Sequence, residues 1–83
     1  MKKTIIQSNK KMYNIILRSE LEGGYTVTVP SLPGCISYGK NLAEAKLMIS
    51  DAIKLYVESL KAHKEIIPTD TETYISSLEV AYA

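Results

Sequence analysis

Two side chains could support nucleophilic or acid–base chemistry at neutral pH: the single cysteine, Cys35, and the single histidine, His63. A cysteine nucleophile needs an adjacent base, and a histidine ligand needs further ligands at a set spacing. Neither residue has such partners in the sequence, which also contains no P-loop, GxGxxG, CxxC or HExxH pattern. We therefore expect Cys35 to be a small buried side chain and His63 to be a surface residue near a helix end.

The nine carboxylates are scattered along the chain rather than clustered. A metal-dependent nuclease needs several carboxylates at one place, because magnesium prefers hard oxygen ligands. The first apolar segment, from Tyr13 to Arg18, contains no carboxylate. The sequence therefore predicts a protein that is not an enzyme, with no catalytic residue, no metal site and no cofactor.

Charge is divided unevenly along the chain, although the formal net charge is only +1. Four of the ten basic residues fall in the first eleven positions: Lys2, Lys3, Lys10 and Lys11. We expect residues 1–11 to form a flexible basic segment and residues 12–83 to form one folded domain. This domain carries six basic and nine acidic residues, a net charge of −3. Such a charge suits a basic protein partner better than a phosphate backbone.

Alternating apolar residues predict two adjacent strands in the first part of the domain. The apolar faces of these two strands are formed by Tyr13, Ile15 and Leu17, and then by Tyr25, Val27 and Val29. The segment LEGG between them supplies a hairpin turn, since glycine accepts a positive φ at little cost.

Glycine and proline residues divide the stretch GGYTVTVPSLPGCISYG, residues 23–39. Pro30 has no amide hydrogen and should end the second strand. Pro33 followed by Gly34 predicts a turn of type II character. A short third strand follows from Cys35 to Tyr38 and is closed by Gly39.

One helix and one more strand complete the predicted order. Asn41, with Glu44 three residues later, has the form of a capping box, and apolar residues then recur at helical spacing as far as Leu60. A loop over residues 64–71 leads to a predicted fourth strand in the final segment, TYISSLEVAYA. We therefore predict an α+β fold of order β-β-β-α-β, an antiparallel-type sheet with a single long helix packed on one face.

The size and composition of the chain indicate its oligomeric state and its location in the cell. A chain of only 83 residues buries about 60% of its unfolded surface when it folds, which leaves a small margin of stability, so we expect a homo-oligomer. The sequence contains neither an apolar run of about eighteen residues nor the apolar core of a signal peptide. We expect a cytoplasmic protein with no membrane partner.

The stretch from residue 23 to the helix resembles the HicB antitoxin family. The family pattern is a glycine turn, a tyrosine-led strand, P-x-L-P-G-C, a short strand, a glycine, and a helix that opens with E-A. The resemblance runs from about Tyr13 to Pro68. The positions that carry it are Gly24, Tyr25, Pro30, Leu32, Pro33, Gly34, Cys35, Ser37, Gly39, Glu44 and Ala45.

The resemblance implies a partial ribonuclease H-like fold without working catalysis. It also implies a partner of the HicA type, a small basic toxin that cleaves messenger RNA and is neutralised when the antitoxin covers its active site. Many HicB proteins continue into a DNA-binding domain. This chain has no room for such a domain, so we do not expect direct DNA binding.

The turns and the acidic positions supply the candidates for toxin contact: Glu20, Glu22, Ser31, Leu32, Tyr38 and Asp70. The remaining motif residues are expected to be chiefly structural: Gly24, Tyr25, Pro30, Pro33, Gly34, Cys35, Gly39, Asn41 and Glu44. An alternative stays open, a small nucleic-acid-binding or orphan regulatory protein that uses the basic segment as an arm. Its affinity for nucleic acid would fall steeply as salt rises.

Overall fold

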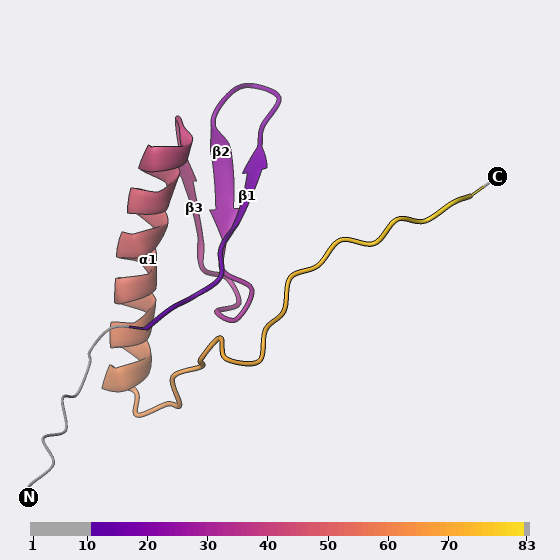
Figure 1. The fold of residues 1–83 in the computed structure, drawn as a ribbon. Helices are drawn as coiled ribbons and strands as arrows, with labels where there is room; N and C mark the ends of the chain where they lie inside the picture. The colour runs from indigo at the N-terminus through magenta and orange to yellow at the C-terminus, as the bar shows by residue number, and fades with distance from the viewer. Residues whose placement is uncertain (1–10, 83) are drawn as a thin grey trace, which may run out of the picture.

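The computed structural model describes residues 11–82, which form one sheet and one helix (Figure 1). The elements are β1 (Ile16–Ser19), β2 (Tyr25–Thr28), β3 (Ile36–Gly39) and α1 (Leu42–Ala62). The sheet is antiparallel with the order β1-β2-β3. The predicted α+β arrangement, a single sheet with one long helix, is confirmed. The predicted basic segment lies outside the described residues apart from Lys11.

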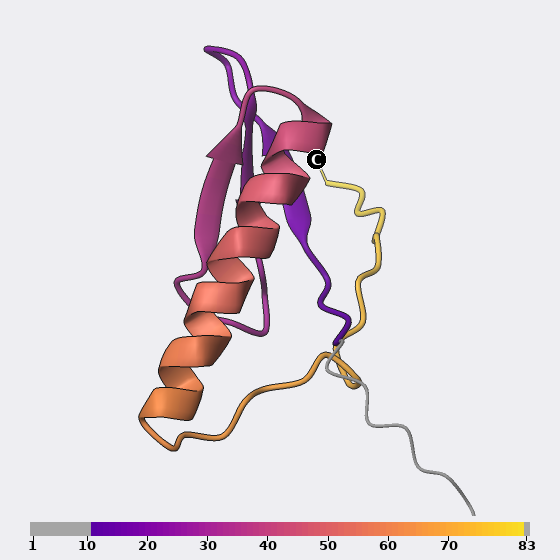
Figure 2. The same cartoon turned by 90° about the vertical axis from the view of Figure 1, so that its left-hand side faces the viewer.

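The strand register gives the sheet two different faces. Leu17, Val27 and Ser37 align across the strands, and Val27 is fully buried beneath α1. The next row, Arg18, Thr26 and Tyr38, lies on the opposite face, because neighbouring residues in a strand point to opposite sides. Figure 2 shows that α1 lies over one face of the sheet. Tyr38 is therefore half exposed on the face that α1 does not cover.

The core forms where α1 packs on the sheet. Its buried residues are Val27, Val29, Leu32, Cys35, Ala45 and Ile49. The predicted apolar residues of the first two strands and of the helix pack around this core, partly buried: Tyr13, Ile15, Leu17, Tyr25, Ala52, Ile53 and Tyr56. Burial raises the pKa of the Cys35 thiol, so this cysteine is an inert core residue, as predicted.

Turn and cap residues position the short strands and fix the start of the helix. The Cys35 amide donates to the Leu32 carbonyl at 3.0 Å with Gly34 at φ +83°, which confirms the predicted type II turn. The Asn41 side chain caps α1 by accepting from the Glu44 amide at 2.8 Å. The Glu44 carboxylate accepts from the Lys40 amide at 2.6 Å, one residue earlier than in a standard capping box.

The chain returns from the end of α1 to the start of β1. A turn at Lys64, whose φ is +57°, closes the helix, and the loop then crosses to Tyr13, whose hydroxyl donates to the Pro68 carbonyl at 2.6 Å. The Asn14 backbone amide donates to the Asp70 carboxylate, and the Asn14 side chain donates to the Thr73 carbonyl. These contacts fix the beginning of the final segment beside the segment that enters β1.

The fourth strand predicted in residues 73–83 is not formed in the described structure, where residues 73–82 make no strand pairing. Figure 1 shows this segment leading away from the sheet. Alternation of apolar residues favours an extended backbone, but a strand also needs a neighbouring edge that accepts its hydrogen bonds. Within one chain the segment does not reach such an edge.

Candidate functional site

The turn between β1 and β2 is held by its own backbone and by a glycine that makes room for a tyrosine. The Glu20 amide donates to the Gly24 carbonyl at 2.9 Å, and the Gly23 amide donates to the Glu20 carbonyl at 3.0 Å. Gly24 has φ +80°, and a Cβ atom there would lie 2.0 Å from the Tyr38 hydroxyl oxygen. Glycine at this position therefore lets the tyrosine of β3 lie against the turn.

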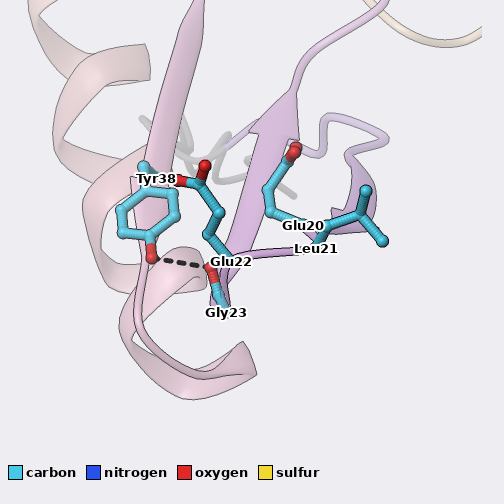
Figure 3. Close-up of a pocket in the computed structure, with 5 residues that line it drawn as sticks. All are labelled: Glu20, Leu21, Glu22, Gly23 and Tyr38. Atoms are coloured by element: carbon cyan, nitrogen blue, oxygen red, sulfur yellow. Dashed lines mark hydrogen bonds between the residues drawn. The ribbon is translucent and has the colours of Figure 1, made fainter.

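A hollow of about 440 Å³ opens at this turn (Figure 3). We call it the hairpin hollow, and it is lined by Glu20, Leu21, Glu22, Gly23 and Tyr38. The Tyr38 hydroxyl donates to the Gly23 carbonyl at 2.9 Å, which fixes the ring across the turn. The Thr26 hydroxyl donates to the Glu20 carboxylate at 2.6 Å and orients it. The hollow is thus held in shape by β2 and β3.

The chemistry of the hairpin hollow suits a cationic side chain. Two exposed carboxylates, Glu20 and Glu22, lie beside an aromatic ring and the fully exposed side chain of Leu21. A carboxylate forms charge-assisted hydrogen bonds with arginine or lysine, and the face of a tyrosine ring also attracts such cations. The structure brings three of the six predicted contact residues together here: Glu20, Glu22 and Tyr38.

The other three predicted contact residues, Ser31, Leu32 and Asp70, do not line the hairpin hollow. Leu32 is fully buried in the core, so it offers no surface to a partner. The Asp70 carboxylate accepts from the Asn14 amide, and this bond, followed by one from the Thr73 side chain, lowers the pKa of Asp70. Asp70 therefore joins the final segment to the start of β1.

Ser31 lies close enough to lower the pKa of Asp70 slightly further, although its hydroxyl makes no hydrogen bond of normal geometry. Both the Ser31 hydroxyl oxygen and one Asp70 oxygen are buried without a partner in the described structure. Burial, and then the nearby Asp70 charge, raises the pKa of Tyr13. This group of residues holds the fold together around the entry to β1.

Residues 11–82 contain no group of three His, Cys, Asp or Glu side chains that could hold a metal ion. His63 is exposed at the end of α1, where its Nδ1 atom lies 2.8 Å from the Ser59 carbonyl oxygen. The surface position predicted for this histidine is confirmed. No helix among the described residues is long and apolar enough to span a membrane.

A second hollow, of about 700 Å³, lies between α1 and the segment that enters β1. We call it the lysine groove, because three exposed lysines of α1 line it: Lys46, Lys54 and Lys61. Apolar lining comes from Ile15, Ile49, Ile53 and Val57. The sequence predicted contacts only for the apolar stripe of this helix, which does not include these lysines. The groove was missed because it forms between the helix and residues 11–15, which helical spacing alone does not bring together.

Comparisons with known proteins give a consistent result. Residues 13–82 match the family model described as HicB_like antitoxin of bacterial toxin-antitoxin system. A UPF0150 protein of Thermoplasma acidophilum is 45% identical over 64 residues, which cover 77% of this chain and 93% of that protein. A UPF0150 protein of Synechocystis is 43% identical over 74% of this chain and 80% of its own length. A UPF0150 protein of Helicobacter pylori is 35% identical over 87% of this chain and 99% of its own length.

Proposed function

Because this chain belongs to the HicB-like antitoxin family of bacterial toxin–antitoxin systems, we propose that it binds and neutralises a small basic ribonuclease of the HicA type. Membership of an antitoxin family implies a toxin as partner. We infer the HicA type from the resemblance of the sequence to the HicB family, and the masking of the toxin's active site is part of the same proposal. The chain contributes binding and performs no reaction of its own. We place this pairing in the cytoplasm, where messenger RNA is cleaved.

The main structural support for toxin binding is the hairpin hollow. The turn that carries its two carboxylates is fixed by the Tyr38 hydroxyl, and Thr26 orients the Glu20 carboxylate. The turn and the Glu20 side chain therefore have little freedom to lose on binding. Leu21 projects from the same turn and can enter an apolar depression of the partner. In this proposal Glu20 and Glu22 bind lysine or arginine side chains of the toxin. The ring of Tyr38 provides the surface on which those side chains stack.

Residues 12–83 carry a net charge of −3, which also favours the attraction of a cationic toxin. A negative domain speeds the encounter with a cationic protein, and this effect weakens as salt screens the charges. Charge complementarity changes the association rate more than the final affinity. The basic residues at the start of the chain are not needed in this proposal.

The test uses the product of a neighbouring gene that encodes a small basic protein of the HicA type. We expect co-expression to restore cell growth, and deletion of residues 1–11 to leave that rescue intact. Changing both hairpin carboxylates, Glu20→Lys with Glu22→Lys, should slow association about tenfold or more at low salt. The matched control is Asp51→Lys with Glu65→Lys, which makes the same charge change at two exposed positions outside the hairpin. We expect the control to slow association much less.

Two results would contradict the proposal. Equal slowing by the hairpin and control variants would show that the hairpin has no special part in toxin contact. Tight, salt-sensitive binding to RNA or DNA through the basic segment, with no binding to the toxin, would favour the nucleic-acid-binding alternative. Self-association is also part of our proposal, and we do not propose direct DNA binding.

A further inference from the structure

Residues 73–82, which we call the tail, expose more apolar surface than a stable free segment normally does. Tyr74, Leu78 and Tyr82 are 86%, 88% and 92% exposed. Large exposed apolar surfaces usually mark contact sites. The tail leads away from the folded body (Figure 1), and the radius of gyration is accordingly 16.6 Å, against about 12 Å for a compact domain of this length.

The tail alternates like a strand that has one apolar face. Its even positions carry Tyr74, Ser76, Leu78, Val80 and Tyr82. Its odd positions are Thr73, Ile75, Ser77, Glu79 and Ala81. The even face is the more apolar of the two and is the one expected to turn toward a core.

The sheet offers a matching edge at β1. In the described structure β1 pairs only with β2, so its outer edge has no partner strand. An open edge of this kind is a template for another strand. The helix packs mainly over β3 and β2. It leaves a hollow, the lysine groove, beside the residues that lead into β1, among them Tyr13 and Ile15.

Charge also matches between the tail and the groove. The tail and its two preceding residues contain Glu72 and Glu79 and no basic residue. The groove is lined by Lys46, Lys54, Lys61 and Lys11, with Glu58 as its acidic residue. A negative apolar strand would therefore match the positive rim and the apolar floor of this groove. A nucleic acid would match the rim but not the apolar floor.

We propose that the tail of a second copy of this chain adds as a strand to the outer edge of β1 and seats its even-numbered side chains over the lysine groove. The exchange is reciprocal, so each copy gives one tail and receives one, as a two-fold dimer requires. The Asn14 contacts to Asp70 and Thr73 hold the start of the tail beside the segment that enters β1, but beyond that point the tail leads away from its own sheet (Figure 1). The outer edge of β1 therefore stays open to the tail of another copy. The groove is incomplete without that occupant.

This inference rests on the self-association part of the proposed function and is independent of toxin binding. The test measures the mass of the full chain by sedimentation at micromolar concentration, together with amide hydrogen exchange across residues 73–82. We expect a dimer in which the tail amides are protected. The variant Leu78→Asp with Val80→Asp should be a folded monomer with an unprotected tail. The matched control, Ser77→Asp with Ala81→Asp, adds the same charge on the outer face and should remain a dimer.

A second pair of variants tests the groove. Lys54→Glu with Lys61→Glu should weaken the dimer at least tenfold at low salt, and addition of Glu72→Lys with Glu79→Lys should restore part of that loss. A monomer with a protected tail would show that the tail pairs with its own β1, which overturns the exchange. A dimer with an unprotected tail would confirm self-association and show that the tail does not form the interface. A monomer with an unprotected tail would overturn both, and toxin neutralisation would still be testable by itself.

Discussion

The hairpin hollow and the lysine groove differ in charge and in what builds them. The hairpin hollow is formed by five residues of one turn and the neighbouring strand, and it presents carboxylates. The lysine groove is formed by α1 and the segment entering β1, and its floor includes Ile49 of the buried core. A local turn can change its surface without endangering the fold, whereas the groove shares its residues with the core. The difference suits a variable partner at the turn and a second copy of the chain at the groove.

The largest expected effect is the loss of the fold when the shared floor is charged. Ile49 is buried, and a buried carboxylate without a partner costs several kcal/mol. A domain of this size has a total stability of roughly 5–10 kcal/mol. We therefore expect Ile49→Asp to abolish cooperative thermal unfolding, measured by circular dichroism. The control Ile49→Val should cost only about 0.5–1.5 kcal/mol. An unchanged melt for Ile49→Asp would contradict the placement of the groove floor in the core.

A smaller, local effect is expected in the hairpin hollow. Gly24→Ala places a methyl group against the Tyr38 ring at a positive φ, and we expect it to cost about 1–3 kcal/mol while the domain stays folded. Gly23→Ala is the matched control, because it meets the same kind of backbone strain with no atom within 4 Å. If Tyr38 shapes the toxin contact, Gly24→Ala should weaken toxin binding more than Gly23→Ala does in a titration. Equal effects would remove Tyr38 from the contact.

Local rules were sufficient to predict much of this fold. The hairpin glycines, the turn at Pro33 and Gly34, the Asn41 cap and the helical stripe each depend on neighbours within a few residues. Those elements are confirmed, although β1 begins at Ile16, so that Tyr13 and Ile15 of the predicted first strand precede it. The prediction of a fourth strand was wrong for the described residues. A strand there would have to pair with a sheet edge formed by residues far away in the sequence, and the segment does not reach such an edge.

The candidate site was only half predictable for the same reason. Glu20, Glu22 and Tyr38 meet because β2 and β3 pair in a register that the turns impose. Leu32 could not be separated from surface residues by spacing, since turn residues are usually exposed. Asp70 was treated as a free acidic group, yet the return of the chain from α1 brings it to the Asn14 amide. The lysine groove was missed entirely, because it joins segments more than thirty residues apart.

The smallest expected effect concerns Asp70, which fixes the root of the tail rather than either hollow. The hydrogen bond from the Asn14 amide lowers the pKa of Asp70 in the folded chain below its unfolded value of about 4. A lowered carboxyl pKa contributes stability that is present above the unfolded pKa and is lost as the pH falls through the folded pKa. We therefore expect Asp70→Asn to melt at a lower temperature than the wild type at pH 7, and the difference to shrink as the pH falls below 4. Glu65→Gln removes an exposed carboxylate in the loop that follows α1 and serves as the control for the loss of one negative charge. A constant difference in melting temperature between Asp70→Asn and the wild type across this pH range would show that the charge of Asp70 contributes nothing to stability. The Asn14 side chain, which donates to the Thr73 carbonyl, would then remain as the contact of Asn14 with the tail.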